Sequence, residues 1–231
     1  MIKNLFDFDA YFFDFDGLLA STEKLHFHAY KKMLENRGFH LRWDFKTYCK
    51  FAHLSTEALA SSIYQEFPLL FTQETSWYYL REEKQAIYLD LLDKEPVELM
   101  PGVANFLKIL IDLKKPKYVV TNAPTNQVQK IKKKEPLLDC FEFWVTREYY
   151  NTPKPSPECY LKALEIYGDP HCNGIGFEDS AKGIEALISS PIVPILICPK
   201  EYPTPCINNK KIQGIYHSFE DLLAESLNSH G

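Results

Sequence analysis

The sequence lacks long apolar runs, and this absence narrows the classes of protein that it can encode. No segment of about 18 uninterrupted apolar residues occurs, which a transmembrane helix would need. The stretch from Met1 to Asp7 also lacks the apolar part of a signal peptide. We therefore expect a cytoplasmic protein with no membrane partner, and its 231 residues suffice for one large domain or for a core with a small companion.

An excess of positive charge is also missing. The formal net charge is -5 and the pI is near 5.8, so no global positive field attracts nucleic acid. The one basic run, Lys130–Lys134, is best explained as the solvated face of a helix. We therefore expect no nucleic acid as a partner, and no feature predicts a protein partner.

Cysteine occurs without a recognisable pattern. The sequence has no Cys-x-x-Cys pair and no histidine at zinc-ligand spacing. In a chain without an export signal, we expect buried or idle thiols and no disulfide framework. The six residues are Cys49, Cys140, Cys159, Cys172, Cys198 and Cys206, the last in a Pro-rich loop that could expose it.

The chain changes character twice along its length. Residues 10–15 form a short aromatic run that suits a buried strand. Residues 22–92 have the pattern of helices, one of which can begin at Ser55 as its N-cap. The Pro101-Gly102 pair marks the end of this helical block.

A regular alternation of strands and helices follows this block. Strands are expected at 117–121, 143–146, 174–177 and 193–197, and helices at 103–113, 126–134, 157–167, 180–188 and from a cap at Ser218 through Leu223. Such alternation predicts an α/β fold, with a parallel sheet covered by helices on both faces. Because the first strand precedes the helical block, we expect a core domain of residues 1–19 and 97–231 with a helical cap domain of residues 20–96 inserted in it.

Each of four expected strands is followed by charged or hydroxyl-bearing residues. Ligands bind at the carboxyl edge of an open parallel sheet, where these residues would meet. One such residue would mean little, but four clusters on four strands predict a site. The clusters are Asp14 with Asp16, Thr121-Asn122, Lys154, and Glu178-Asp179.

The charges in this set favour a site for a metal and a phosphate. Several carboxylates in one crevice need a cation or protons, because like charges at short range disfavour ionisation. Oxygen ligands without matching histidine or thiolate favour Mg²⁺ over zinc. Lys154 adds a positive charge that makes good sense if a phosphate lies between metal and ammonium.

The two acids at the first strand can have different tasks. Residues i and i+2 of a strand project to the same side, so Asp14 and Asp16 can face one pocket. A carboxylate can attack phosphorus, so one of the two acids can be the nucleophile and the other the general acid, which later acts as base for water. A simple turn would explain Asp16-Gly17 alone, but the three other clusters favour the site.

These motifs resemble those of the haloacid dehalogenase superfamily in order and approximate spacing. The segment 22–26 and the helical block after it resemble the β-phosphoglucomutase-like branch, with an α-helical cap inserted after the first motif. The resemblance spans nearly the whole chain and implies a Rossmann-like core. Its motifs are Asp14-Phe15-Asp16-Gly17-Leu18, Thr121-Asn122, Lys154-Pro155-x-Pro157 and Phe177-Glu178-Asp179-Ser180-x-x-Gly183.

The resemblance implies roles for the catalytic residues. Asp14 resembles the family's nucleophile and a metal ligand. Asp16 resembles the general acid and base, with its backbone carbonyl on the metal, and Lys154 the lysine that steadies nucleophile and phosphate. The two aspartates fit phosphatases and phosphomutases, because the dehalogenase branch lacks the second acid.

The resemblance implies binding residues as well. Thr121 and Asn122 match the motif that binds the transferring phosphoryl group. Glu178 and Asp179 match the acidic pair that completes Mg²⁺ coordination. Both pairs also have a simpler explanation. Thr121-Asn122 could cap the helix that follows it, and Glu178-Asp179 could stabilise the N-terminus of the next helix through its dipole.

The expected cap carries weaker signals. His26, Lys50, His53 and Thr56 are candidates for substrate contact, although ordinary loop roles explain them as well. In β-phosphoglucomutases an arginine of the cap grips the distal phosphate, and Ser55 matches that place.

Two further departures do not touch the core site. Ser21 stands where many relatives carry Asp, and residues 189–191 (Ser-Ser-Pro) replace the usual Ala-Gly.

The sequence therefore predicts a Mg²⁺-dependent phosphatase that acts on a small phosphorylated metabolite, such as a sugar phosphate. A β-phosphoglucomutase-like phosphomutase is the nearest alternative, in which a second substrate hydroxyl replaces water. A catalytically idle regulatory or ligand-binding relative is the alternative from another class.

Overall fold

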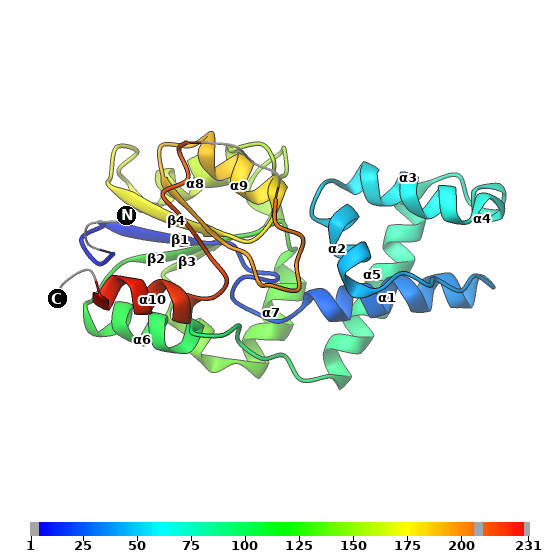
Figure 1. Cartoon of the computed structure of the whole chain (residues 1–231), viewed down its shortest axis with the longest axis horizontal. Coiled ribbons are helices and arrows are strands. Elements are labelled where there is room, and N and C mark those ends of the chain that lie inside the picture. Colours follow the sequence, from blue (N-terminus) through cyan, green and yellow to red (C-terminus); the bar gives the residue numbers. More distant parts are fainter. Residues whose placement is uncertain (1–4, 206–209, 229–231) are drawn as a thin grey trace. The chain divides into compact units, whose positions relative to one another are not determined.

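Figure 1 shows a computed structural model of the chain, which describes residues 5–205 and 210–228. The chain forms two compact units, an α/β unit of residues 1–21, 98–200 and 204–231 and a helical unit of residues 22–97 and 201–203. The short segment 201–203 groups with the helical unit, which no sequence pattern predicted. That these units act as catalytic core and cap stays a prediction.

Within the described residues, the α/β unit contains one sheet of six parallel strands in the order β3-β2-β1-β4-β5-β6. The predicted α/β fold, Rossmann-like with a parallel sheet, is confirmed. One strand was missed, because β6 spans only three residues and begins with glycine. The strands are β1 (Ala10–Phe13), β2 (Lys117–Val120), β3 (Phe143–Val145), β4 (Gly174–Glu178), β5 (Val193–Ile197) and β6 (Gly214–Tyr216).

Strand β1 lies in the middle of the sheet, between β2 and β4, and its four residues are all buried. Phe13 is in register with Val119 of β2 and with Phe177 of β4. The three strands therefore end at the same level. This register brings the residues that follow Phe13 and Phe177 to a common edge of the sheet.

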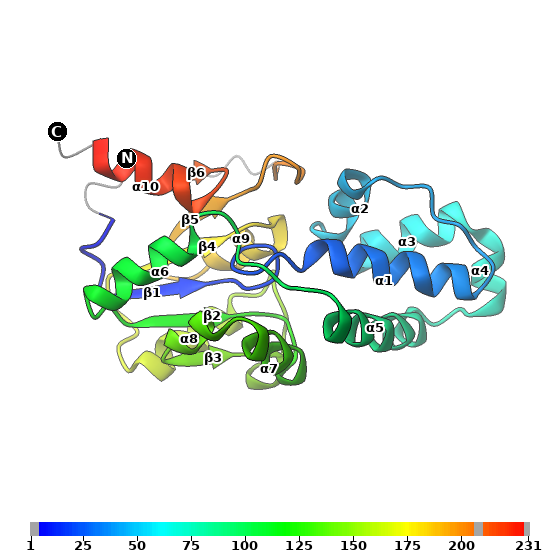
Figure 2. The ribbon, with the colours of Figure 1, turned by 90° about the horizontal axis from the view of Figure 1, so that it is seen from below.

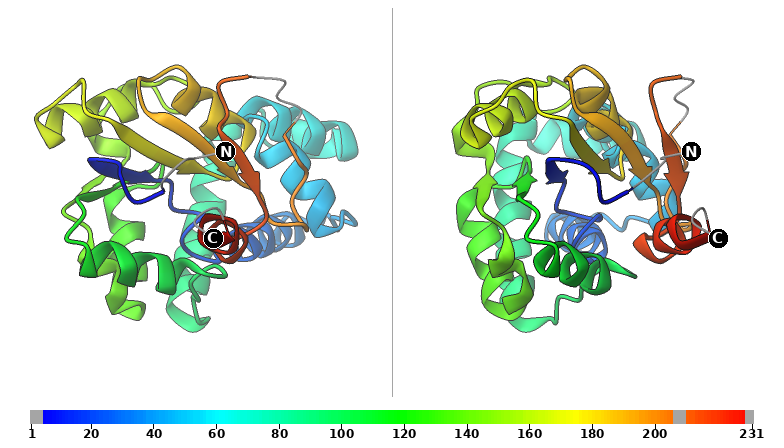
Figure 3. Two further views of the ribbon diagram at one scale, coloured as in Figure 1. Left: turned by 60° about the vertical axis from the view of Figure 1, so that its left-hand side comes forward. Right: turned by 90° about the vertical axis from the view of Figure 1, so that its left-hand side faces the viewer.

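Helices cover both faces of the sheet, with α8 and α9 on one face and α6 and α10 on the other (Figures 1 and 3). Single turns of 3-10 helix, at Pro136–Cys140 and Arg147–Tyr149, were not predicted. The last helix begins as expected, since Ser218 Oγ accepts a hydrogen bond from the N–H of Asp221 at 3.1 Å. The helices are α6 (Val103–Asp112), α7 (Thr125–Lys134), α8 (Glu158–Tyr167), α9 (Ala181–Ile188) and α10 (Phe219–Asn228).

An aromatic cluster joins the sheet to α6 and α10. Phe13 stacks on Phe177 with ring centroids 5.0 Å apart, and Phe106 of α6 lies 5.0 Å from Phe219 of α10. All four rings are fully or almost fully buried. Each contributes about 1.5–3 kcal/mol by leaving water, so this cluster holds the central strands in place beneath the site edge.

The helical unit consists of five helices in the described residues, and α1 packs along α5 (Figure 2). The predicted N-cap is confirmed, because Ser55 Oγ accepts a hydrogen bond from the N–H of Ala58 at 3.0 Å. Asp44 caps α2 in the same way. The helices are α1 (Glu23–Asn36), α2 (Phe45–Ala52), α3 (Thr56–Glu66), α4 (Pro68–Gln73) and α5 (Trp77–Lys94).

Two short segments of the α/β unit flank the inserted helices and run side by side. The N–H of Ser21 donates to the carbonyl of Glu98 at 2.8 Å, and that of Met100 donates to Leu19 at 2.9 Å. An antiparallel bridge between Ala20 and residue 99 lies between these bonds. The chain thus leaves and re-enters the α/β unit at one place.

Among the described helices, none is both long and apolar enough to span a membrane. The five described cysteines form no disulfide, and four of them are buried. Cys206, which was expected in a Pro-rich loop that could expose it, is outside the described residues.

Gly102 offers a test of the packing between α6 and α10. Its φ of +82° is unfavourable for other residues, and an added Cβ would collide with the backbone of Phe219 and Glu220. We expect Gly102→Ala to lower the free energy of unfolding by about 2–4 kcal/mol in urea titrations. Gly168→Ala is the matched control, because Gly168 has a φ of +92° but open space around its Cβ position. Equal losses in the two variants would contradict the close packing at Gly102.

Candidate active site

Acidic side chains converge where β1 and β4 end. Asp14 follows the last residue of β1, and its N–H donates to the carbonyl of Phe177 at 3.0 Å. Glu178 is the last residue of β4 and Asp179 follows it. Carboxylate oxygens of Asp14, Glu178 and Asp179 lie within 4.8 Å of one another, all on side chains with little exposure. The strand register therefore produces the predicted acidic cluster.

A buried lysine lies within this cluster. Lys154 is 6% exposed, so it is not a solvated loop residue. Its Nζ donates to Asp14 Oδ1 at 2.6 Å, to Glu178 Oε1 at 2.6 Å and to the carbonyl of Val120 at 2.8 Å. Three donors thus meet three acceptors, which is the condition for placing an ammonium in a protein interior.

The surroundings of Asp14 raise the pKa of its carboxyl group. Burial raises the pKa of Asp14 to about 7, since desolvation and the neighbouring Glu178 together outweigh the attraction of Lys154. Burial also disfavours the Lys154 ammonium, but Asp14 and Glu178 attract it strongly enough to hold the pKa of Lys154 well above its usual value. The lysine is therefore a permanent positive charge beside the carboxyl group expected to act as nucleophile.

Glu178 is held in place by one oxygen. Its Oε1 accepts from Lys154 and, at 2.5 Å, from the hydroxyl of Tyr160. Its Oε2 is buried and has no hydrogen-bond partner. The Glu178 carboxylate also fills the space beside Gly183 of α9, where a Cβ would collide with it. A buried oxygen without a hydrogen bond is costly unless a cation binds it.

These observations fit a divalent cation with hard oxygen ligands. Asp14, Glu178 and Asp179 supply carboxylate oxygens at short range, which is the donor set that Mg²⁺ prefers. The orphaned Oε2 of Glu178 is the atom that gains most from a cation. The Asp16 carboxylate is not in this group, in keeping with its expected contribution of a backbone carbonyl only.

Asp16 lies in the turn after β1, where Gly17 has a φ of +83°. The side-chain amide of Gln127, in α7, donates to both carboxylate oxygens of Asp16 at 3.2 Å. This bidentate contact fixes the orientation of the side chain that is expected to exchange protons with the substrate. Gln127 is 2% exposed and was not a candidate in the sequence, because no motif marks it.

Thr121 and Asn122 lie at the end of β2 and do not cap α7, which begins later, at Thr125. The Thr121 hydroxyl accepts from the N–H of Ala123 at 3.0 Å. The side-chain carbonyl of Asn122 accepts from the hydroxyl of Tyr150 at 2.7 Å and from the N–H of Lys154 at 3.2 Å. Thr121 keeps its hydroxyl proton and Asn122 its amide protons for another acceptor, such as a phosphoryl oxygen.

Of the residues around the acidic pair, Ser180 has a simple role as a helix cap. Ser180 caps α9, because its hydroxyl accepts from the N–H of Gly183 at 3.2 Å. Glu178 belongs to the strand before it, so it does not serve as a first-turn acid of that helix.

The four substrate candidates of the helical unit have different surroundings. Lys50 and Thr56 are exposed. His26 stacks on Tyr88 with ring centroids 3.9 Å apart, and its Nδ1 lies 2.5 Å from Lys84 Nζ. His53 is 5% exposed and therefore has little surface to offer a substrate in this unit. Their contact with substrate stays a prediction.

Sequence reasoning missed the residues that orient the site. Gln127, Tyr150 and Tyr160 each contact a predicted residue, but they come from α7, a loop and α8 and belong to no motif. The only signal was Gly183, which lies within the last motif and whose missing side chain makes room for Glu178.

Comparison with known proteins agrees with the fold. The haloacid dehalogenase-like hydrolase family matches residues 8–190. A phosphorylated carbohydrates phosphatase of Thermotoga maritima is 26% identical over 92% of this chain and 88% of its own length. A probable pseudouridine-5'-phosphatase of Drosophila melanogaster is 27% identical over 86% of this chain and 83% of its own length.

A solved structure extends the likeness to the fold. The β-phosphoglucomutase of Clostridium difficile superposes with a TM-score of 0.72, at 21% identity, over 96% of this chain and 98% of its own.

An α/β unit with this acidic edge, together with the family match, defines a hydrolase. The chain belongs to the haloacid dehalogenase-like hydrolases. The predicted superfamily is confirmed, and so is the predicted class of enzyme, a phosphohydrolase of this superfamily. Enzymes of this family generally use Mg²⁺, which agrees with the acidic cluster of Asp14, Glu178 and Asp179.

The raised pKa of Asp14 predicts that Mg²⁺ binding depends on pH. Because that pKa is about 7, the ion must displace a proton from Asp14 at lower pH. We expect the apparent Kd for Mg²⁺ to rise roughly tenfold for each pH unit below 7, and to level off above it. Isothermal titration in two buffers of different ionisation enthalpy measures both affinity and proton release.

The stability of the metal-free protein should change with pH in the opposite direction to its Mg²⁺ affinity, that is, it should fall as pH rises. The folded-state pKa of Asp14 lies above the ordinary 3.8, so its contribution to stability is complete below that value and is lost as pH rises toward 7. Asp14→Asn is the control for both measurements, since the amide does not titrate. The same pH dependence in Asp14→Asn would contradict the assignment to Asp14.

Gly183→Ala tests the space kept for Glu178. Alanine at a helix interior position normally stabilises by about 0.5–1 kcal/mol, so any loss reports the collision with the carboxylate. We expect lower stability and at least about tenfold weaker Mg²⁺ binding. Glu178→Asp added to Gly183→Ala shortens the acid and should restore part of the stability. No recovery in the double variant would contradict the steric explanation.

Proposed function

We propose that this chain is a Mg²⁺-dependent phosphatase that hydrolyses a small phosphorylated metabolite through an aspartyl-phosphate on Asp14. One observation carries the proposal: the buried Lys154 ammonium is 2.6 Å from Asp14 Oδ1 within a cluster of metal-binding carboxylates. A site that binds only a cation does not need an ammonium among its carboxylates. A site that accepts a phosphoryl group does need one, because the ammonium neutralises the negative charge of that group.

The surrounding residues support a division of labour in two steps. In the first step a carboxylate oxygen of Asp14 forms a bond to phosphorus, and the bond from phosphorus to the leaving oxygen breaks. Asp16 donates a proton to that oxygen. In the second step Asp16 takes a proton from water, which attacks the phosphoryl group and releases Asp14. The Gln127 amide holds the Asp16 carboxylate in one orientation for both transfers.

Positive and hydrogen-bonding groups would receive the phosphoryl oxygens. Thr121 and Asn122 have protons left to donate, and Lys154 neutralises negative charge on the same edge. When bound by Asp14, Glu178 and Asp179, Mg²⁺ would supply further positive charge to the transferring group. The backbone carbonyl of Asp16 is the proposed fourth protein ligand.

The names of the relatives support a class of substrate. Proteins similar to this chain are named a phosphorylated carbohydrates phosphatase and a probable pseudouridine-5'-phosphatase. Both names describe phosphate esters of small, sugar-containing molecules. We therefore propose a sugar phosphate or a related ester as substrate, in the cytoplasm, with His26, Lys50, His53 and Thr56 as candidate contacts in the cap.

A phosphomutase needs a second group that holds the far phosphate of its bisphosphate intermediate. Ser55, which matches the arginine position of β-phosphoglucomutases, has its hydroxyl engaged as the N-cap of α3. Its short neutral side chain cannot replace an arginine in binding a phosphate. Hydrolysis therefore remains the proposed reaction.

Substitution of the two acids tests the proposal. With p-nitrophenyl phosphate and a panel of sugar phosphates, we expect phosphate release that requires Mg²⁺. Asp14→Asn should lower kcat by about 1,000-fold or more, because the nucleophile is lost. Asp16→Asn should lower it by about 100- to 10,000-fold, as expected for loss of an acid and base.

Asp112→Asn, an exposed residue at the end of α6, is the control and should leave kcat unchanged. Turnover that persists in Asp14→Asn would refute the aspartyl-phosphate. Wild-type protein without turnover on the whole panel would favour the idle ligand-binding alternative. Conversion of a hexose 1-phosphate to its 6-phosphate would favour the mutase.

A further inference from the structure

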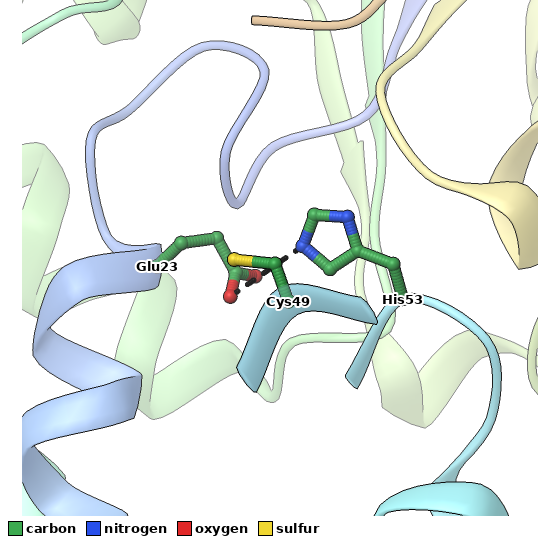
Figure 4. A group of neighbouring side chains, drawn as sticks. All are labelled: Glu23, Cys49 and His53. Carbon is green, nitrogen blue, oxygen red and sulfur yellow. Dashed lines mark ion pairs between the residues drawn. The ribbon is translucent and has the colours of Figure 1, made fainter. Parts of the chain in front are cut away.

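A second cluster of metal-ligand side chains lies within the helical unit. Glu23, Cys49 and His53 each offer one ligand atom, and these atoms lie within 4.8 Å of one another. Glu23 begins α1, whereas Cys49 belongs to α2 and His53 follows its last residue. Figure 4 shows the three side chains pointing toward one another from these two helices.

Helix geometry fixes two of these side chains on one face. Cys49 and His53 are four residues apart, and the N–H of His53 donates to the carbonyl of Cys49 at 2.9 Å, so the helical turn continues through His53. Residues at this spacing are neighbours on the helix surface. The side chains of Cys49 and His53 can therefore reach one common ligand from a single helix face.

The imidazole of His53 points independently to a ligand. Its side chain is 7% exposed, and neither Nδ1 nor Nε2 has a hydrogen-bond partner. Burying a polar ring without hydrogen bonds costs roughly 1–3 kcal/mol. Nε2 lies 3.7 Å from Glu23 Oε2, too far for a hydrogen bond. Two ligands of one tetrahedral zinc ion would be roughly 3.4 Å apart, given bonds of about 2.0–2.2 Å, so the observed gap is close to that separation.

The surroundings of the cluster favour a bound cation. Cys49 is fully buried, and Tyr202 covers the His53 ring edge-on with centroids 5.0 Å apart. A thiolate and a carboxylate together would carry two negative charges, which a divalent ion neutralises.

We propose that Glu23, Cys49 and His53 bind a divalent transition metal of the zinc class, with the fourth position taken by water. A sulfur, a nitrogen and an oxygen ligand form a set that zinc accepts and that Mg²⁺ does not. The ion joins the start of α1 to the end of α2 and thereby stabilises the helical unit. This site is separate from the carboxylates of the α/β unit, and its existence does not depend on the proposed phosphatase reaction.

Cobalt(II) provides a direct spectroscopic test with the full-length protein. Metal-stripped wild type is titrated with Co²⁺ in excess Mg²⁺, which occupies the carboxylate site of the α/β unit. We expect one equivalent of Co²⁺ to give the thiolate-to-metal charge-transfer band and the visible bands of four-coordinate cobalt. Added Zn²⁺ should displace the cobalt and raise Tm.

Variants assign the ligands. Cys49→Ser should abolish the charge-transfer band, and Glu23→Gln and His53→Gln should each weaken Zn²⁺ binding at least about tenfold. Cys140→Ser, a thiol of the α/β unit, is the matched control and should leave the band intact. Circular dichroism of each metal-free variant checks folding, and Glu23→Gln, which keeps both the thiol and the ring, serves if Cys49→Ser does not fold.

Results from the wild type or from the variants could overturn the proposal. In the wild type these are cobalt binding without a thiolate band, or no cobalt binding at all. In the variants they are a band that survives in Cys49→Ser or a band that is lost in Cys140→Ser. Phosphatase activity enters neither readout, so failure of the phosphatase assay leaves this test intact, and the reverse also holds.

Discussion

The buried Lys154 ammonium is the interaction on which the site depends. It joins the ends of three strands, because its partners are Asp14 after β1, the carbonyl of Val120 in β2 and Glu178 of β4. Without this charge, two carboxylates would face each other in the protein interior. The sheet register delivers the acids to one edge, and the lysine makes their proximity tolerable. Metal and phosphate binding are then uses of an arrangement that the fold already stabilises.

Much of the α/β unit could be predicted from the sequence, because β1, β2 and β4 are buried along their whole length and consist largely of apolar residues. The strand ends then located Asp14, Thr121, Lys154 and Glu178 without knowledge of their contacts. Strand β6 escaped prediction, since three residues starting with glycine carry no usable periodicity. Residues that act by orientation, such as Gln127, escaped because only the folded chain reveals which side chain they touch.

In the helical unit the helices could be predicted from the sequence, but the cluster of side chains could not. Its helices and the Ser55 cap follow from local patterns, whereas the meeting of Glu23 with Cys49 and His53 depends on how α1 packs against α2. Cys49 and His53 are four residues apart, and they become neighbours only because the chain between them is helical. Side chains brought together by packing between helices are the class of site that a single sequence hides best.

The paired segments at residues 19–21 and 98–100 have a consequence for the architecture as a whole. Because the chain departs and returns at hydrogen-bonded neighbours, a short turn from Ser21 to Glu98 could close the α/β unit without the 76 residues between them, 22 to 97. The helical insert is in this sense an exchangeable module mounted on a two-stranded stem. Different inserts on the same stem would leave the phosphoryl chemistry in place while presenting it to different molecules.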